Sequence, residues 1–306
     1  MINIERSIIK VLAYFNIFNY PLEKDEIYNF LDINCERGHF ENAIDSLCDD
    51  GILYRIDEFY SLQKNISLAE RRKNGSKLAA VLLKKAGQIS RFLYGFPFVK
   101  GIAVSGSLSK NYAEKNSDID FFIITTANRL WIARTCMHMF KKITFITGRQ
   151  HCYCMNYYID EQGLEIKEKN VFTAIETMTV MPFCDDGIFE TFFSANKWAK
   201  SFLPLSQPKI IAARHLPKTI SKSVIEKVFN NAVGNWLNDR LMSITMKRWK
   251  NKAEQHQRSY RGELMGLDDS RHYAKPDPAN FQKRILYRYS KEVEAFMMRL
   301  ENVNSV

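Results

Sequence analysis

Residues 104–125 read VSGSLSKNYAEKNSDIDFFIIT, a Gly-Ser turn and two aspartates placed between apolar segments. Side chains at positions i and i+2 of a β-strand point to the same side of the sheet. Asp118 and Asp120 lead into the apolar strand predicted for residues 121–125, so we expect both carboxylates to reach one small region of space. Two carboxylates this close repel each other unless a cation lies between them, and hard oxygen ligands suit Mg²⁺. The pair therefore predicts a metal site.

The Gly-Ser turn supplies what such a metal site lacks. Gly106 has no Cβ and lets the backbone approach a phosphate closely, and Ser107 can donate both its hydroxyl and its N–H. Mg²⁺ usually keeps water and substrate phosphates among its ligands. A phosphate-binding turn beside a carboxylate pair predicts phosphate chemistry.

Gly106-Ser107, a ten-residue spacer and Asp118-Ile119-Asp120 resemble the signature of the DNA polymerase β-like nucleotidyltransferase superfamily. The resemblance implies that the aspartates bind two Mg²⁺ ions and that the Gly-Ser turn holds the β- and γ-phosphates of an NTP, with ATP the first candidate. A nucleotidyl group then passes to an acceptor hydroxyl and pyrophosphate leaves. In-line phosphoryl transfer needs positioning and charge neutralisation, which a two-metal clamp provides. With Gly106 and Ser107, we count Lys110 and Ser117 as nucleotide-binding candidates.

A third carboxylate from a neighbouring strand normally completes this site, and here the sequence departs from the pattern. The next predicted strand, residues 152–159, carries Asn156 where an acid is expected. The other candidates are Asp160 in the following turn and Glu165 in a short apolar-acid-apolar strand at 164–166. We choose Glu165 as the third catalytic acid. If Asn156 fills that position, the general-base role weakens and the chain becomes a nucleotide-binding relic.

Composition indicates a folded, basic protein. A chain of 306 residues with 46% hydrophobic residues is long enough for two or three domains. It has no run of about 18 apolar residues and no recognisable export signal, so we expect no membrane insertion. Six cysteines without a framework favour a reduced, cytoplasmic protein. The net charge of +10 fits a phosphate-rich partner such as an NTP or RNA, and fits a solubilising surface equally well.

Residues 1–66 are expected to form three helices and a hairpin, which resemble a winged helix-turn-helix module. Such modules commonly bind DNA through the third helix. Here that helix carries Glu41, Asp45, Asp49 and Asp50, which would face DNA phosphates. The acidic charge argues against DNA binding and favours a protein-interaction or scaffold role.

The rest of the chain is expected to divide into a nucleotidyltransferase core at 67–210 and a helical domain without strands at 211–306. The predicted fold class is thus α+β, with a mixed sheet and helices in the core. Residues 247–261 are basic with interleaved aromatics, which suits either single-stranded nucleic acid or a helix with a buried aromatic face. His272 and Lys275 lie in a polar loop from which they could reach a bound triphosphate.

These features predict Mg²⁺-dependent transfer of a nucleoside monophosphate from an NTP to a protein, small-molecule or RNA acceptor. The alternative is a catalytically degenerate, nucleotide-binding regulator that uses the winged-helix-like module to bind a partner or DNA. An intact Gly-Ser turn and aspartate pair favour the enzyme. The doubtful third carboxylate favours the regulator.

Overall fold

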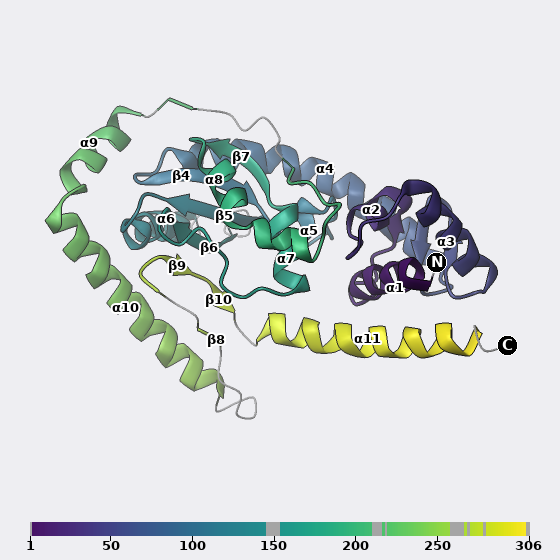
Figure 1. Cartoon of the computed structure of the whole chain (residues 1–306). Helices are drawn as coiled ribbons and strands as arrows, with labels where there is room; N and C mark the ends of the chain where they lie inside the picture. The colour runs from purple at the N-terminus through teal and green to yellow at the C-terminus, as the bar shows by residue number, and fades with distance from the viewer. Residues whose placement is uncertain are drawn as a thin grey trace.

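A computed structural model describes residues 2–144, 154–209, 216–217, 219–257, 266–267, 270–277 and 280–303. Its centre is a five-stranded sheet of order β7-β4-β5-β6-β9 (Figure 1). The strands are β4 (Val99–Val104), β5 (Asp120–Thr125), β6 (Cys154–Asp160), β7 (Met181–Asp185) and β9 (Tyr273–Ala274). β4 pairs antiparallel with β5, and β5 pairs parallel with β6. The prediction of a mixed α+β structure is confirmed.

Helices cover both faces of this sheet because its central strands are apolar on both sides. One face carries Ile102, Phe121 and Ile123, which share a core with α4 (Ser67–Tyr94) and with Trp131 of α6 (Leu130–Thr144). The opposite face carries Phe122 and Ile124, which pack against α8. On this side lie α7 (Val171–Thr179) and α8 (Ile188–Ala195), followed by a 3₁₀ helix at Lys197–Ser201. Strand β5 is therefore packed against helices on both of its faces.

The N-terminal segment contains the three helices and the hairpin that the sequence predicts. They are α1 (Ile2–Asn16), α2 (Lys24–Asn29), α3 (Arg37–Asp49), β2 (Tyr54–Ile56) and β3 (Phe59–Ser61). A two-residue strand, β1 (Leu22–Glu23), adds to the hairpin and makes a three-stranded sheet of order β1-β3-β2. Leu22, Phe40 and Leu47 are fully buried in the core of this segment.

The described residues of the C-terminal part include the helices α9 (Ile220–Phe229), α10 (Ala232–Gln257) and α11 (Phe281–Val303). α10 packs along α6, and α11 runs back beside α1 (Figure 1). No helix among the described ranges combines the length and the apolar character that crossing a bilayer requires.

The expectation of a strand-free tail is wrong. β9 joins the edge of the core sheet by pairing antiparallel with β6, and β8 (Gly266–Leu267) pairs with β10 (Pro276–Asp277). Each piece is two residues long, too short to show a period-2 pattern, and each forms because a strand edge offers backbone hydrogen bonds. One strand of the tail, β9, is thus part of the core sheet, whereas β8 and β10 form a separate two-stranded sheet.

β7 is a further strand that the sequence analysis did not predict, and it contains Pro182. Proline cannot donate a ladder hydrogen bond and is confined to edge strands. β7 is the edge strand beside β4, which is why it tolerates Pro182.

Arg72 on α4 is a buried charge that joins the N-terminal segment to the core. Only 2% of its side chain is exposed, and it donates to Glu26 Oε1 on α2 (2.8 Å) and to the carbonyl of Asn111 (3.0 Å). Its guanidinium carbon also lies 4.2 Å from the centre of the Tyr20 ring. Burial raises the pKa of the Glu26 carboxyl, and the Arg72 charge opposes this rise.

Replacing Arg72 by Ala should lower the free energy of unfolding by about 3–5 kcal/mol, because it leaves Glu26 and the Asn111 carbonyl without their cation. Urea unfolding followed by circular dichroism measures this. Lys77→Ala is the matched control, since Lys77 lies at an exposed position of the same helix, where loss of a surface charge changes stability by about 0–1 kcal/mol. Equal losses in the two variants would contradict the role given to Arg72.

His138 on α6 is held neutral inside the protein. Burial, followed by the charges of Arg134, Lys141 and Lys142, lowers the pKa of His138 to about 3. Its Nε2 atom finds no hydrogen-bond partner within the part of the chain that the structure describes. Its ring centre lies 6.2 Å from that of Tyr158.

This burial predicts acid sensitivity. The unfolded chain takes up a proton at His138 near pH 6.5, whereas the folded chain does so only near pH 3. Stability should therefore be full above pH 6.5 and fall as the pH decreases toward 3. His138→Leu should reduce that pH dependence, and His39→Leu at an exposed position should not. Unfolding temperatures measured between pH 7 and 4 test this, and parallel curves for wild type and His138→Leu would refute it.

Candidate functional site

The Gly-Ser turn lies directly against the second aspartate. β4 ends at Val104, and Gly106 begins the short helix α5 (Gly106–Ser109) with a φ of +71°. A Cβ at Gly106 would stand 2.9 Å from Asp120 Oδ2. The backbone N–H of Ser105 donates to the Asp120 carbonyl at 2.9 Å, which fixes the turn to the start of β5. Antiparallel pairing of β4 and β5 thus brings the two halves of the motif together.

The two aspartates flank a residue that points into the core. Ile119 is 2% exposed, Asp120 is half-buried, and Asp118 is exposed and precedes the first residue of β5. Of the two aspartates, Asp120 lines both hollows described below, whereas Asp118 lines neither. The hydroxyl of Ser117 accepts from the N–H of Glu114 at 2.8 Å and closes the turn before the pair.

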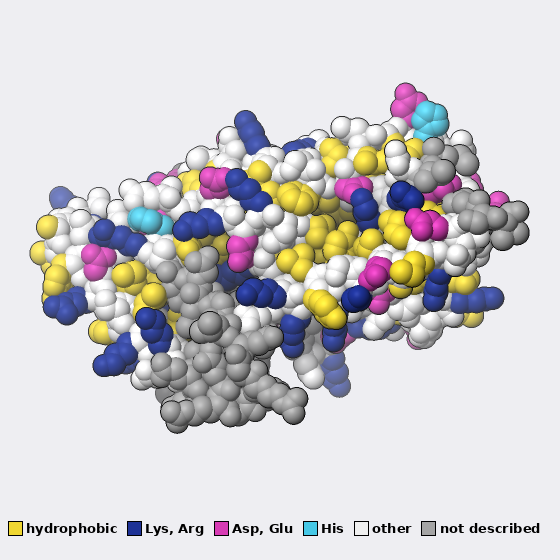
Figure 2. Space-filling model, turned by 60° about the horizontal axis from the view of Figure 1, so that its bottom comes forward, with side chains coloured by type: hydrophobic (Ala, Val, Ile, Leu, Met, Phe, Trp, Pro, Cys, Tyr) yellow, Lys and Arg dark blue, Asp and Glu magenta, His cyan; other side chains and the backbone are white. Residues whose placement is uncertain are grey.

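Two hollows meet at Asp120. They share the lining residues Gly106, Asp120, Phe172, Glu176 and Phe281. The first hollow, of about 430 Å³, is also lined by Ser107, Lys110, Ser117, Arg71 and aromatic side chains of the N-terminal segment. The second hollow, of about 410 Å³, is mostly apolar and includes Phe122, Tyr157, Val180, Phe192 and Lys275. Figure 2 shows hydrophobic side chains gathered in a hollow of one face, with charged side chains of both signs at its rim.

Lys110 supports the Gly-Ser turn. Its side chain is 12% exposed. The ammonium donates to the Gly106 carbonyl at 3.0 Å and to Glu176 Oε1 at 2.7 Å. The Lys110 carbonyl in turn accepts from the Tyr20 hydroxyl. Of the four predicted nucleotide-binding residues, Gly106, Ser107, Lys110 and Ser117, all line the first hollow.

Glu176 is the carboxylate that the sequence interpretation missed. It projects from α7 and lines both hollows together with Asp120. One signal could have found it, because it is the single charged residue in the helix VFTAIETMT, whose other side chains are mostly buried. An acid kept on such an apolar helix usually has a partner.

The strand predicted around Glu165 is wrong. Residues 161–170 form turns and bends, and Glu165 is exposed, pairs with Lys169 at 2.6 Å and lines neither hollow at Asp120. An i,i+4 ion pair in solvent satisfies this carboxylate locally. Glu165 is therefore not placed to act with Asp120.

Asp160 is also distant from Asp120. It pairs with Thr125 at the far end of β5, where it is fully buried. There it accepts from the N–H of Asn128 at 2.8 Å and lies 3.0 Å from His272 Nδ1. These contacts fix the β6 end and its connection to β9, so His272 does not reach toward a triphosphate.

Asn156 lies at an irregularity of β6, since Phe121 pairs with Met155 and Phe122 with Tyr157. Its side chain lies outside the described part. Lys275, in contrast, lines the second hollow.

Residues 83–178 match the family model of the nucleotidyltransferase domain. This match spans the Gly-Ser turn, both aspartates and Glu176. No curated protein and no solved structure matches the chain. The turn and the aspartates thus lie inside the region that matches the nucleotidyltransferase domain model.

The donors fit a Mg²⁺ ion that is completed by its substrate. No three His, Cys, Asp or Glu side chains converge as a metal site among the residues described. Asp118 and Asp120 offer hard oxygen ligands, and the missing Cβ of Gly106 leaves room beside Asp120 Oδ2. Mg²⁺ commonly takes one or two carboxylates and fills its octahedron with phosphate oxygens and water.

Gly106→Ala should destabilise the fold by more than a left-handed backbone conformation alone would cost, which is about 1–2 kcal/mol. The new Cβ would press on Asp120 Oδ2. Gly51→Ala is the matched control, because Gly51 has a φ of +67° and nothing within 4 Å of a built Cβ. Urea unfolding of both variants separates the contact from the backbone cost. Equal destabilisation would show that the approach to Asp120 is not tight.

Proposed function

We propose that this protein transfers a nucleoside monophosphate from an NTP to an acceptor hydroxyl in a Mg²⁺-dependent reaction. The observation that carries this is the approach of the Gly106 turn to the Asp120 carboxylate at the junction of two hollows. This arrangement provides a place for phosphates beside a place for a metal. The match of residues 83–178 to the nucleotidyltransferase domain supports the same reaction class.

In this proposal the chain's own groups bind and orient. The Ser107 hydroxyl and the turn backbone hold the β- and γ-phosphates, and Lys110 keeps the turn in place through the Gly106 carbonyl. Asp118 and Asp120 hold Mg²⁺, which neutralises phosphate charge when bound. The acceptor oxygen forms a bond to the α-phosphorus, the bond from that phosphorus to the bridging oxygen breaks, and pyrophosphate leaves. The hydroxyl proton passes to water or to a carboxylate at the junction.

We propose three units with the predicted boundaries: a winged-helix-like module at 1–66, a transferase core at 67–210 and a C-terminal region at 211–306. The module serves as a scaffold, because Tyr14, Phe15 and Phe18 from α1 and the turn after it line the first hollow. Its third helix keeps its acids exposed at Asp45, Asp49 and Asp50, which disfavours contact with DNA phosphates.

A nucleotide-binding regulator without catalysis is the second candidate. It is favoured by the segment Cys154-Met155-Asn156, which has no acid where β6 begins beside Asp120. An RNA acceptor gains less support, because Trp249 of the basic stretch takes part in helix packing. The centre of its ring lies 6.0 Å from that of Trp131 and 4.5 Å from the guanidinium carbon of Arg134. Tyr260 of that stretch lies outside the described residues.

Asp118→Asn and Asp120→Asn should abolish Mg²⁺-dependent binding of ATP, GTP, CTP or UTP. With an acceptor present, pyrophosphate release should fall by about 100-fold or more, since metal-based charge stabilisation contributes several kcal/mol. Calorimetry with and without Mg²⁺ measures the binding. Asp45→Asn, at an exposed position of α3, is the control and should bind as wild type does. Unchanged nucleotide affinity in both site variants would exclude the proposed metal site, and binding without pyrophosphate release would favour the regulator.

A further inference from the structure

The second hollow has an apolar body that the nucleotide phosphates do not explain. Phe122 of β5, Tyr157 of β6 and Phe192 of α8 line it, together with Phe172 of α7 and Phe281 at the start of α11. The rings of Phe122 and Tyr157 meet edge to face with centres 5.1 Å apart. Aromatic walls of this kind bind apolar or aromatic groups.

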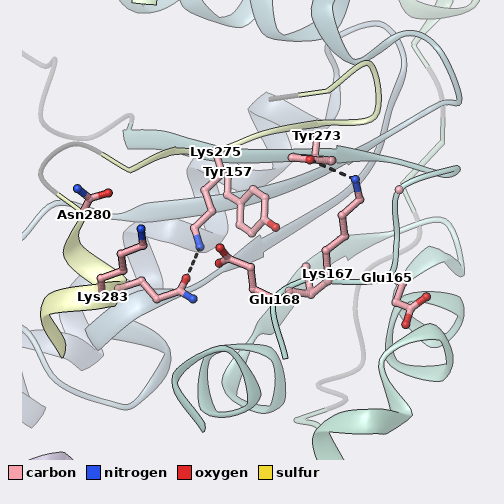
Figure 3. A pocket seen from close by; sticks show the side chains of 11 residues that line it. Tyr157, Glu165, Lys167, Glu168, Tyr273, Lys275, Asn280 and Lys283 are labelled. Carbon is pink, nitrogen blue, oxygen red and sulfur yellow. Dashed lines mark hydrogen bonds between the residues drawn. The ribbon is translucent and has the colours of Figure 1, made fainter. Parts of the chain in front are cut away.

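The outer end of this hollow is basic. Tyr157, Ile166 and Lys275 line both the second hollow and a neighbouring pocket of about 80 Å³ (Figure 3). This lysine pocket also contains Lys167 and Lys283. Tyr157, Ile166 and Lys275 therefore border the hollow at Asp120 on one side and the lysine pocket on the other.

The lysine pocket keeps an excess of positive charge. Lys275 donates to the amide oxygen of Gln282 at 3.2 Å, and Lys167 donates to the Tyr273 hydroxyl at 3.2 Å, so both contacts are to neutral groups. Two carboxylates, Glu165 and Glu168, also line the pocket. Glu165 points away from the lysines in Figure 3 and is paired with Lys169 at 2.6 Å. Glu168 is then the carboxylate that offsets the charge of the three lysines Lys167, Lys275 and Lys283 in this pocket.

In-line transfer decides which substrate enters this hollow. The attacking and leaving oxygens lie on opposite sides of the transferred phosphorus. Ser107 and Ser117 line only the first hollow of the two, so in the proposed reaction the leaving pyrophosphate lies there. The attacking hydroxyl then approaches Asp120 from the second hollow.

We propose that the acceptor is a small amphipathic molecule with a hydroxyl, an apolar or aromatic body and an anionic group, either carboxylate or phosphate. Its body lies among Phe122, Tyr157 and Phe192, its anionic group contacts Lys275, and its hydroxyl faces Asp120. This assignment rests on the proposed function and specifies its acceptor.

Three probes test the assignment: 2-naphthol, 2-naphthoate and 2-naphthyl phosphate. They share the naphthalene ring and differ in the charge of the group attached to it. Both anions should bind wild type more tightly than naphthol. Lys275→Gln should remove this preference by about 10-fold or more, as expected for a hydrogen bond to a charged group. Lys84→Gln, at an exposed position of α4 that lines none of these pockets, is the matched control and should preserve it. Phe281→Ala, at a side chain 44% exposed, should weaken all three probes.

The same titrations with saturating MgATP separate acceptor from nucleotide. Retained anion binding supports the assignment, and the tighter of the two anions then identifies the group as carboxylate or phosphate. Competitive displacement by MgATP would overturn it, since the hollow would then hold the nucleotide. An anion preference that is missing, or unchanged in Lys275→Gln, while MgATP still binds would overturn the acceptor class and leave the transfer function standing. Anion binding without any MgATP binding would instead overturn the transfer function, and the acceptor role with it.

Discussion

The buried guanidinium of Arg72 is the contact on which the geometry of the cleft depends, the cleft being the two hollows that meet at Asp120. It lies on α4 and binds Glu26 of the N-terminal segment on one side and the Asn111 carbonyl on the other. Asn111 lies two residues after the end of α5, so the segment that follows the Gly-Ser turn is held by a charge anchored outside the core sheet. A buried cation is expensive to desolvate and persists only where hydrogen bonds and an anion satisfy it. This constraint makes the N-terminal segment a structural part of the site.

Close backbone approaches reinforce this contact. A Cβ at Gly75 of α4 would stand 2.2 Å from the Tyr112 ring, and Tyr112 meets the ring of Tyr20 edge to face with centres 5.3 Å apart. The Tyr20 hydroxyl binds the Lys110 carbonyl. The loop after α5 is thus enclosed by α4 and the N-terminal segment. These contacts hold the loop after α5 beside the first hollow.

Prediction from the sequence succeeded where the signal was local. Gly106 and Asp120 are brought together by an antiparallel pair of neighbouring strands, and spacing alone indicates such a pair. The apolar strand after Asp120 and the helices α1, α3 and α4 follow from periodicity. Prediction failed for Glu165, where an apolar-acid-apolar pattern imitated a strand, and for β7 and β9, whose pairing comes from sheet edges. The buried contacts of Arg72 were not predicted, because burial of a single arginine leaves no trace in the sequence pattern.

The sequence by itself determined the Gly-Ser turn, the aspartate pair and the strands that join them, because strand alternation and turn chemistry act over a few neighbouring residues. Only the tertiary structure decided which other groups line the two hollows that meet at Asp120. Glu176 meets Lys110 across 66 residues of chain, and Lys275 arrives from a strand edge near the C-terminus. Such meetings depend on how α7, β9 and α11 pack on the sheet, and packing depends on the whole set of buried surfaces. The motif can therefore be identified from the sequence, whereas the shape and charge of the cleft around it arise only on folding.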